Sequence, residues 1–370
     1  PSAPNGVLDV EIVDNDEPPT FALSVADVEE GETATLNLTL SGPSAKPISV
    51  LVATADGTAS SADYEAVSAT VDFAPGETSK TLSVVTIEDT TDEFDETVLV
   101  NISEAVNVLV PEIAYSFSIL DDDEAPSLSF TDQSVAEGAS FDVEFVLSEA
   151  SAKDISFSVT TAVGTAGAND FTAVSETLTI SAGATTATQS FSVLQDALDE
   201  EDETFTINVG DLTNVSAANS SATVTILDDD EAPSVTISGS NNLTEGQDLT
   251  VTVALSTASG RNVSLDLVTE DGQATAGEDY VALNQTVTFA PGETSTTVTV
   301  AGLDDTLDEV NEVFTVVAGN PVNTSIASSE SAPNGILGVL IEDNDEAPEF
   351  VLPADFSVAE DAGTANVTVA

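Results

Sequence analysis

Hydrophobic and polar residues alternate along most of the chain, with a period of two rather than the 3.6 residues of a helix. β-branched residues, which strands favour, occupy many of the hydrophobic positions. In the first 120 residues the alternation predicts seven strands, over residues 20–25, 33–40, 48–55, 69–74, 79–87, 96–104 and 114–120. Gly, Pro, Ser and Asp cluster between these segments, as turns require. No segment shows a convincing helical period.

A motif rich in Asp repeats along the chain and divides it into similar units. It begins, with separations of 107, 107 and 115 residues, at Asp14, Asp121, Asp228 and Asp343. A Glu-containing motif travels with the same period and begins at Val28, Val135, Leu243 and Val358. The second and third units show the same seven-strand pattern as the first.

Seven short strands in about a hundred residues predict an immunoglobulin-like β-sandwich for each unit. The expected fold class is therefore all-β, with seven-stranded sandwiches arranged end to end. Residues 1–16 nearly duplicate the segment from Ser331, so we expect them to be the last strand of a preceding repeat in a longer protein. The predicted domains then follow as residues 17–123, 124–230 and 231–345, with residues 346–370 as the start of a fourth repeat.

The chain is strongly acidic, and its own cations cannot neutralise it. It has 67 Asp and Glu residues against 4 Lys and Arg, for a formal net charge of −63. Two like charges about 4 Å apart repel by about 4 kcal/mol at an effective dielectric constant of about 20, so a cation from outside must offset adjacent carboxylates. The hydrophobic content of 41% is enough for a buried core, which distinguishes the chain from a disordered acidic tail.

Composition also excludes several classes of partner and site. Phosphate recognition needs clustered Lys and Arg, so no nucleic acid is expected as a partner. The absence of Cys and His excludes a disulfide framework and the usual zinc sites. No apolar run is long enough to span a bilayer, so we expect no direct membrane insertion.

The acids of the first unit fall in four groups, each at the end of a predicted strand. They are Glu30, Asp56, the run from Glu88 to Glu96, and the run from Asp121 to Asp123. Matching positions recur in the other units, whereas a solvated acidic linker, the plainer alternative, would scatter its acids. Ca²⁺ takes about six to eight oxygen ligands in flexible geometry, including bidentate carboxylates. We therefore predict Ca²⁺ sites in these loops.

The order of these motifs resembles the Calx-beta repeat. A VxEG turn is followed by DGTA and DY, then by FxPGE, by DxxxDExxE and finally by DDDExP. This module occurs in the regulatory loop of sodium/calcium exchangers, in integrin β4 and in large bacterial surface proteins, and the resemblance covers essentially the whole chain. It implies an immunoglobulin-like sandwich whose Ca²⁺ ions cluster at one end, near the junction with the next module.

The resemblance implies a set of metal ligands in each unit. In the first unit these are Glu30, Asp56, Glu88, Asp89, Glu93, Glu96, Asp121, Asp122 and Asp123. In the second unit they are Glu137, Asp196, Glu200, Glu203, Asp228, Asp229 and Asp230. In the third unit they are Glu245, Asp271, Asp304, Asp305, Glu309, Glu312, Asp343 and Asp345.

The second unit departs most from this pattern. Val163 stands at the position of Asp56, and Gln195 stands at the position of Glu88. Because two carboxylates are missing, we expect fewer or weaker ions in the second unit. In the third unit Asn344 replaces the middle Asp of the last run but still offers a carbonyl oxygen.

A further Asp precedes an aromatic residue in every unit. The pairs are Asp63 with Tyr64, Asp170 with Phe171 and Asp279 with Tyr280. We interpret the aromatic residue as a core anchor and the Asp as a turn-former that bonds its own loop, rather than as a metal ligand.

Two hypotheses for function stay open, and catalysis is disfavoured. A glycosidase uses a carboxylate pair, but three near-copies without His, Cys or Trp offer little to bind a sugar or activate a nucleophile, so we expect no enzyme. Tandem repetition and the near-absence of Lys and Arg favour a calcium-stiffened extender in an adhesion protein, which we expect to be bacterial. The alternative is a calcium sensor that regulates a neighbouring domain, as in the exchangers. Direct binding of a glycan has no support beyond the acids.

The expected partners follow from the extender hypothesis. They are calcium ions and the adjacent repeats of the same chain, in a monomeric rod. We expect an extracellular or cell-surface location, where high net charge maintains solubility. Calcium affinity separates the hypotheses, because extracellular modules bind at about 10⁻⁴ to 10⁻³ M and sensors at about 10⁻⁷ to 10⁻⁵ M.

Overall fold

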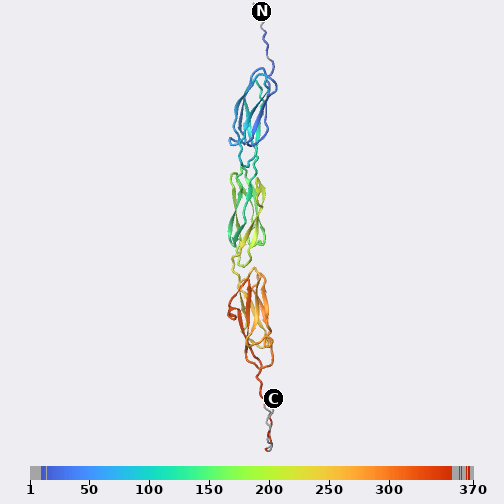
Figure 1. The fold of residues 1–370 in the computed structure, drawn as a ribbon, viewed down its shortest axis with the longest axis vertical. Helices are drawn as coiled ribbons and strands as arrows, with labels where there is room; N and C mark the ends of the chain where they lie inside the picture. The colour runs from blue at the N-terminus through green and yellow to red at the C-terminus, as the bar shows by residue number, and fades with distance from the viewer. Residues whose placement is uncertain are drawn as a thin grey trace, which may run out of the picture.

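The computed structural model describes residues 10–13, 15–351, 358, 360, 364 and 366. These residues form three β-sandwiches that follow one another along the long axis, the first near the top of Figure 1 and the third near the bottom. The expected strand of a preceding repeat, residues 1–16, falls largely outside the described residues, and its described part forms no strand. Most of the expected fourth repeat, residues 346–370, also lies outside them.

The first sandwich packs a three-stranded sheet against a five-stranded sheet. Its strands are β1 (Phe21–Ser24), β2 (Val28–Glu29), β3 (Thr33–Leu40), β4 (Ile48–Asp56), β5 (Ser68–Phe73), β6 (Ser79–Val85), β7 (Glu96–Val106) and β8 (Tyr115–Leu120). The strand orders are β1-β3-β6 and β2-β8-β7-β4-β5.

The second sandwich adds one short strand to the smaller sheet. Its strands are β9 (Ser127–Ser129), β10 (Gln133–Ala136), β11 (Ser140–Leu147), β12 (Ile155–Val163), β13 (Ser175–Ile180), β14 (Thr186–Ser192), β15 (Glu203–Thr213), β16 (Ser216–Ala217) and β17 (Ser221–Leu227). The strand orders are β14-β11-β9-β16 and β10-β17-β15-β12-β13.

The third sandwich repeats this arrangement. Its elements are β18 (Ser234–Ser238), β19 (Asn242–Thr244), β20 (Leu249–Leu255), β21 (Val263–Asp271), β22 (Asn284–Phe289), β23 (Ser295–Val300), β24 (Glu312–Val322), β25 (Ser325–Ile326), the 3₁₀ turn η1 (Pro333–Gly335) and β26 (Ile336–Glu342). The strand orders are β23-β20-β18-β25 and β19-β26-β24-β21-β22.

The predicted all-β class of tandem immunoglobulin-like sandwiches is confirmed. All seven strands expected for the first unit are present, and their ends differ from the prediction by at most two residues. The alternation did not predict β2, which is only two residues long. The exact domain boundaries stay a prediction.

The alternating pattern works because every second residue of a strand faces the interior. In β3, for example, Ala34, Leu36 and Leu38 are completely buried, while the residues between them are exposed. The aromatic residue after each DY-type Asp is buried as expected: Tyr64 is 2% exposed and Tyr280 is 1% exposed. Each sandwich thus has a hydrophobic core of its own.

The pairing of the outer strands brings distant acids together. β2 pairs with β8 in parallel, with Val28 beside Ile119 and Glu29 beside Leu120. β10 pairs with β17, and β19 with β26, in the same way. Because parallel strands run towards the same end of a sheet, the turn after the first strand lies next to the segment after the last. We call this end, where the chain leaves the sandwich, the C-terminal pole.

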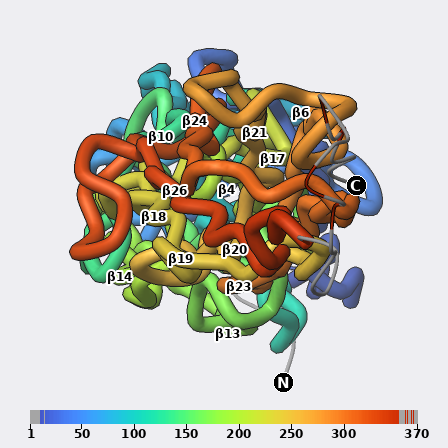
Figure 2. The backbone as a smooth tube through the Cα atoms, turned by 90° about the horizontal axis from the view of Figure 1, so that it is seen from below, coloured from blue at the N-terminus to red at the C-terminus, as the bar shows by residue number. Residues whose placement is uncertain are grey.

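Seen along the long axis, the three sandwiches overlap one another (Figure 2).

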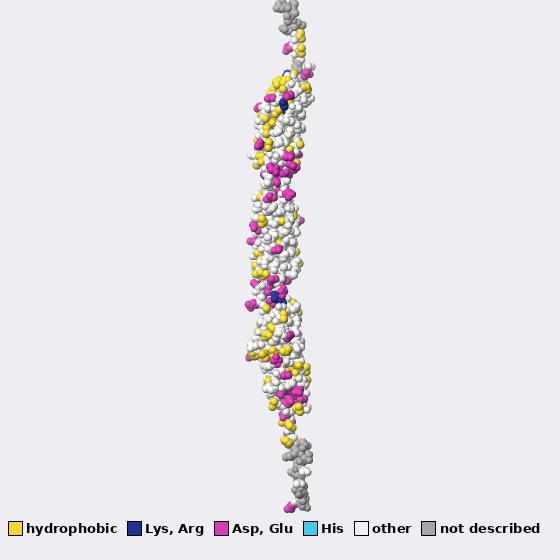
Figure 3. All heavy atoms as spheres, viewed as in Figure 1, with side chains coloured by type: hydrophobic (Ala, Val, Ile, Leu, Met, Phe, Trp, Pro, Cys, Tyr) yellow, Lys and Arg dark blue, Asp and Glu magenta, His cyan; other side chains and the backbone are white. Residues whose placement is uncertain are grey.

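The acidic side chains are concentrated at the ends of the sandwiches. Acidic side chains gather at the two junctions and at the far end of the third sandwich, as Figure 3 shows. Within the described part of the chain, no helix has the length and apolar character needed to cross a membrane.

Candidate metal centres

Three acidic segments meet at the C-terminal pole of each sandwich. In the first sandwich they are the turn after β2, the loop between β6 and β7, and the segment after β8. The turn depends on Gly31, whose φ of +73° favours glycine. A Cβ there would also lie 2.3 Å from the Glu88 Oε2 atom. Glycine therefore lets the turn approach the loop closely.

The loop between β6 and β7 recurs in the other sandwiches, and we call it the acidic loop. It comprises residues 86–95, 193–202 and 301–311 in the three sandwiches. Each acidic loop begins with the same turn, in which an Asp side chain accepts a hydrogen bond from the backbone two residues later. The donors are Thr91, Leu198 and Leu307, at 2.6, 2.8 and 2.7 Å.

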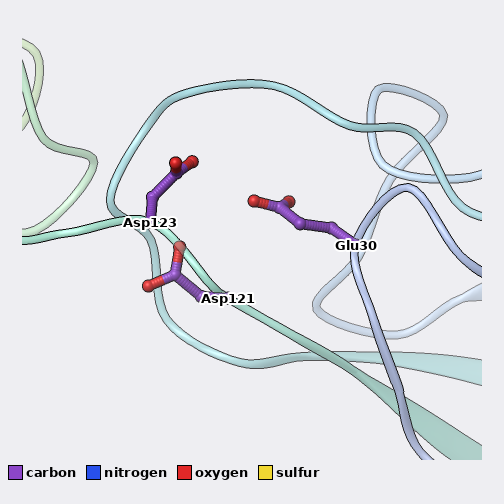
Figure 4. A group of neighbouring side chains, drawn as sticks. All are labelled: Glu30, Asp121 and Asp123. Carbon is purple, nitrogen blue, oxygen red and sulfur yellow. The ribbon is translucent and has the colours of Figure 1, made fainter.

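A first group of carboxylates, the pole cluster, joins the turn to the segment after the last strand. In the first sandwich it consists of Glu30, Asp121 and Asp123, whose carboxylates point towards one another (Figure 4). One oxygen from each lies within 4.8 Å of the others. The equivalent groups are Glu137 with Asp228 and Asp230, and Glu245 with Asp343 and Asp345.

Several oxygens of the pole cluster are buried without a hydrogen-bond partner. Burying such an atom is costly, and an acceptor that lacks a donor requires another source of positive charge. No basic residue supplies a hydrogen bond to these atoms. They are Oε1 of Glu30, Oδ2 of Asp123, Oδ1 of Asp228, Oδ2 of Asp230 and Oδ2 of Asp345.

The pKa values of the pole cluster reflect this uncompensated charge. Burial and then the charges of Asp89 and Asp123 raise the pKa of Glu30 to about 7. Burial and the charge of Asp196 raise the pKa of Glu137 to about 7. Burial, followed by the neighbouring carboxylates, also raises the pKa of Asp123, Asp230, Glu245 and Asp345.

A second group, the loop cluster, lies beside the first. In the first sandwich it contains Asp63, Glu93 and Glu96, again with one oxygen of each within 4.8 Å of the others. Burial and then the hydrogen bond and charge of Asp63 raise the pKa of Glu96 to about 7. Burial and Asp170 raise the pKa of Glu203 to about 7 in the same way.

The interpretation of Asp63 as a turn-former alone is incomplete. Its Oδ2 does bond its own loop, since it accepts the Ser60 backbone N–H at 2.6 Å. The same carboxylate nevertheless belongs to the loop cluster. The recurrence of this Asp at Asp170 and Asp279 is the sequence signal that could have identified it.

The charge of the predicted ligand Asp89 acts on both clusters. It contributes to the raised pKa of Glu30 and also to that of Glu93. Asp196 has the same effect on Glu137 and Glu200. In the third sandwich, likewise, burial and the charges of Asp305, Asp279 and other neighbours raise the pKa of Glu309, and burial and Asp279 raise that of Glu312.

The predicted ligands Asp56 and Asp271 are not brought into any of the clusters found among the described residues. The Oδ1 of Asp56 accepts a hydrogen bond from the Tyr64 hydroxyl at 2.8 Å. Asp271 accepts one from the Tyr280 hydroxyl. Both carboxylates therefore serve a buried tyrosine next to the loop cluster.

This pairing explains one departure of the second sandwich. Val163 replaces the Asp in the sandwich whose aromatic residue is Phe171, which has no hydroxyl that needs a hydrogen-bond partner. Val163 is 62% exposed. The absence of this Asp thus removes a partner for a hydroxyl rather than a member of a cluster.

Gln195 changes the second site more directly. Its side-chain N–H donates to Oε2 of Glu137 at 3.3 Å and to Oδ1 of Asp229 at 3.0 Å. In the third sandwich the exposed Asn344 donates to Oδ1 of Asp304 at 3.3 Å. Amide donors therefore offset part of the repulsion in the second and third sites, and Lys153 Nζ, 3.2 Å from Oδ2 of Asp121, offsets part of it in the first.

The remaining predicted ligands occupy the rim of the clusters. Asp122 and Asp229, the middle acids of the DDD runs, are exposed, whereas the acids on either side are half-buried. Glu88 lies against Gly31, and Asp304 lies against Gly246 in the same way. None of these four belongs to a cluster found among the described residues.

The donor set fits a hard cation. Both clusters offer only oxygen atoms, several of them buried and without a donor, and the chain contains neither His nor Cys. Such sets suit Ca²⁺, which accepts many carboxylate oxygens in irregular geometry, better than Zn²⁺, which prefers nitrogen and sulfur. The first-sandwich residues that could hold such ions are Glu30, Asp121 and Asp123 in the pole cluster and Asp63, Glu93 and Glu96 in the loop cluster.

The chain was compared with known protein families and sequences, and the repeated motifs match one domain family. The sequence model of the Calx-beta domain matches the chain three times, over residues 14–123, 121–230 and 233–345. Sodium/calcium exchanger 1 of Canis lupus familiaris is 43% identical over 75 residues, which are 20% of this chain and 7% of the exchanger. Sodium/calcium exchanger 3 of Rattus norvegicus is 32% identical over 126 residues, 30% of this chain and 14% of that protein. The chain thus spans a small part of these relatives.

Solved structures show similar sandwiches. The crystal structure of CBD12 from CALX1.2 is 23% identical and covers 53% of this chain and 80% of its own, with a TM-score of 0.28. The tetra-tandem repeat in the extending region of a large adhesion protein is 16% identical, with 88% and 74% coverage and a TM-score of 0.42.

Proposed function

This chain belongs to the Calx-beta domain family, and from that premise we propose that it binds Ca²⁺ at the C-terminal pole of each sandwich and acts as a calcium-stiffened spacer. One observation carries the proposal: the pole cluster recurs three times with buried carboxylate oxygens that no hydrogen-bond donor reaches. A bound divalent cation supplies the missing positive charge. The proposal includes no catalytic step.

The spacer role draws support from the arrangement of the sandwiches. The first two pole clusters lie where one sandwich is succeeded by the next, so a bound ion there acts on the joint as well as on its own sandwich (Figure 3). The three sandwiches follow one another along a single axis (Figure 1). We propose an adhesion protein at the cell surface or secreted from the cell as the setting, because a charge of −63 favours solubility in a salty medium.

Calorimetry of the full chain tests calcium binding. Divalent ions are first removed with chelator, and Ca²⁺ is then titrated at fixed ionic strength. Each occupied site stabilises the folded state by about 2.7 kcal/mol at a hundredfold excess over its dissociation constant. We expect a binding isotherm and a higher unfolding temperature; an unfolding temperature that calcium leaves unchanged contradicts the proposal.

Two substitutions distinguish a specific site from general screening of the acids. Asp123→Asn removes a charge from the pole cluster, whereas Asp72→Asn removes one from the exposed face of β5. We expect the first to weaken calcium binding and the second to leave it unchanged. Equal effects would indicate diffuse screening and no defined site.

A sensor that regulates a neighbouring domain is the second candidate function. The 43% identity with sodium/calcium exchanger 1 over 75 residues favours it. Dissociation constants of about 10⁻⁴ to 10⁻³ M support the extracellular spacer, and constants of about 10⁻⁷ to 10⁻⁵ M support the sensor. The titration described above supplies this number directly.

A further inference from the structure

The joint between the first and second sandwiches contains a buried aspartate. Asp92, in the acidic loop of the first sandwich, is 3% exposed, and Ser151, in the loop between β11 and β12, is 1% exposed. The Ser151 hydroxyl donates to Oδ2 of Asp92 at 2.6 Å. The Ala152 backbone N–H donates to the Asp92 carbonyl at 3.0 Å, and Lys153 Nζ lies 2.6 Å from Oδ1. Every polar group of Asp92 beyond its own N–H thus has a partner in the next sandwich.

The joint between the second and third sandwiches repeats these contacts. Asp199 is 4% exposed and Ser259 is 2% exposed. The Ser259 hydroxyl donates to Oδ2 of Asp199 at 3.0 Å, and the Gly260 N–H donates to the Asp199 carbonyl at 3.0 Å. Arg261 Nη1 lies 3.7 Å from Oδ1. The same Asp–Ser contact therefore forms both joints, and only the basic residue differs, Lys153 in one and Arg261 in the other.

The receiving segment is a loop of the form Ser-x-basic, and the first sandwich has it too. It is Ser44-Ala45-Lys46 there, Ser151-Ala152-Lys153 in the second sandwich and Ser259-Gly260-Arg261 in the third. Of the 4 basic residues in the chain, three occupy this position. We call these segments the Ser-x-basic loops.

The Ser-x-basic loop of the first sandwich already has the receiving conformation. The Ser44 hydroxyl accepts the Lys46 N–H at 3.0 Å, and the Gly76 N–H donates to the Ser44 carbonyl at 2.9 Å. The Asn107 side chain donates to the Pro47 carbonyl at 2.8 Å. The same three hydrogen bonds recur in the other sandwiches, at 2.8 to 3.1 Å. The loop is therefore formed by its own sandwich and does not need a partner to shape it.

The acidic loop of the third sandwich carries the Asp that would contact a Ser-x-basic loop of a following sandwich. Asp308 occupies the position of Asp92 and Asp199, and the turn before it is the same, with the Leu307 N–H bonded to Asp305 at 2.7 Å. Asp308 is exposed, whereas its two counterparts are buried against a following sandwich. The turn is the same in all three loops, and the described residues place a following sandwich only beside Asp92 and Asp199.

We propose that these contacts are a docking code between repeats that works without calcium, and that Asp308 marks a docking surface for a further repeat with a Ser-x-Lys or Ser-x-Arg loop. The two filled joints identify the occupant, because both are made by the same residue types at the same positions. The Glu-containing motif that begins at Val358 resembles those at Val28, Val135 and Leu243, so the sequence after the third sandwich is of the same kind as the proposed occupant. The code rests on protein donors and acceptors, and it adjoins the pole cluster, because Lys153 Nζ also lies 3.2 Å from Oδ2 of Asp121.

A distance measurement in the full chain tests the filled joint. The chain has no Cys, so spin labels can be attached at Thr70→Cys and Thr177→Cys, which are exposed and equivalent positions on β5 and β13. All measurements are made with excess chelator, so the result does not depend on bound metal. We expect Asp92→Ala and Ser151→Ala each to widen the distance distribution about twofold, because each leaves a buried partner unpaired. The double variant should be no wider than the singles.

The chain supplies matched controls for both substitutions. Asp308→Ala and Ser44→Ala remove the same groups from the same loops away from the labelled joint, and they should leave the distribution unchanged. A distribution in the parent chain as wide as in Asp92→Ala, or equal widening by the controls, would overturn the proposal.

A lengthened chain tests the docking surface at Asp308. A second copy of residues 127–230 is placed after Pro348, in place of residues 349–370, with labels at Thr286→Cys and in the added copy at Thr177→Cys. In the original chain Asp308→Ala should leave the distance distribution unchanged. In the lengthened chain it should widen the distribution in chelator by about the same factor as Asp92→Ala does at its joint. An unchanged distribution would show that Asp308 is not a docking residue.

Discussion

The carboxylate of Glu30 experiences the repulsion within the first pole cluster most clearly. Burial and four neighbouring aspartates raise its pKa to about 7, so its charged form is unfavourable in the metal-free protein. Glu30→Gln should therefore stabilise the metal-free chain by about 1 kcal/mol, or about 4–8 °C for a domain of 60–100 residues. The same substitution should weaken calcium binding. Thermal unfolding with and without calcium measures both effects.

A control for this substitution is Glu112→Gln, which removes an exposed carboxylate outside the clusters. It should change neither the metal-free unfolding temperature nor calcium binding appreciably. If Glu30→Gln lowered the stability of the metal-free chain, the carboxylate would be stabilising there, and the account of uncompensated charge would be wrong.

The pH dependence of metal-free stability follows from the same shifts. Burial, and in two cases a hydrogen bond to a neighbouring Asp, raises the pKa from 4.5 to about 7 for Glu30, Glu96, Glu137 and Glu203. Between these two values the folded chain binds more protons than the unfolded chain, so the free energy of unfolding falls as the pH rises. In chelator we expect a higher unfolding temperature at pH 5 than at pH 7.5. Equal temperatures at both values would contradict the raised pKa values.

The chemistry of a residue could be predicted more readily than its role. Acidity at strand ends was visible in the sequence, and the pole clusters assemble the acids expected there. The roles of Asp56 and Asp63 could not be predicted, because each depends on which side chain lies across the loop. The Tyr64 hydroxyl donates a hydrogen bond to Asp56. The carboxylate of Asp63 lies close to those of Glu93 and Glu96. Contacts of this kind are set by tertiary packing, which residue spacing does not record.

At the scale of the element, the Asp56–Tyr64 pair couples β4 to the loop before β5. Asp56→Val leaves the Tyr64 hydroxyl unpaired and should cost about 1 kcal/mol, whereas Tyr64→Phe leaves only an exposed acid and should cost less. The double variant, which copies the Val163 and Phe171 combination, should cost less than the sum. Urea unfolding of the four chains gives the coupling energy, expected near 1 kcal/mol. Strict additivity would contradict the pairing.

The acidic loop between β14 and β15 allows a gain of function in the second sandwich. Gln195→Glu replaces an amide donor to Glu137 with another carboxylate. We expect the variant to bind calcium more tightly and to be less stable in chelator. Glu88→Gln, the same position in the first sandwich, should do the opposite. Titration calorimetry of both variants decides the matter, and unchanged affinity in both would remove this position from the site.

Nearly all of the strands could be predicted, because alternate residues of a strand face the core and must be hydrophobic. β3 alternates exposed and buried residues over its whole length. The two-residue strand β2 could not be predicted because it is too short to show alternation. Its parallel pairing with β8 nevertheless positions Glu30. The element that matters most for the site therefore had the weakest pattern.

For the whole molecule, the overall dimensions provide the test. A compact globule of 370 residues has a radius of gyration of about 21 Å, whereas three sandwiches in line give about 35–40 Å. We expect small-angle scattering in calcium to give the larger value, and sedimentation to give the mass of a monomer. A value near 21 Å, or a dimer mass at low concentration, would contradict the monomeric rod.

The number of sandwiches could be predicted from the 107-residue period, but the joints could not. The sequence shows Ser151 and Asp92 as an ordinary serine and one acid among many. Only the fold brings the loop before β12 against the loop before β7 of the preceding sandwich. Interfaces between repeats arise from surfaces 59 residues apart in the chain, and local patterns do not record them.

The parallel pairing of β2 with β8 determines how a sandwich responds to pulling. The chain enters a sandwich at one end and leaves it at the other, so tension on the chain draws these neighbouring strands in opposite directions along their length. In that geometry the hydrogen bonds between them are loaded together, instead of opening one after another as in a peeled hairpin. The same pairing that assembles the pole cluster therefore resists by shear along the axis on which a tether is stretched.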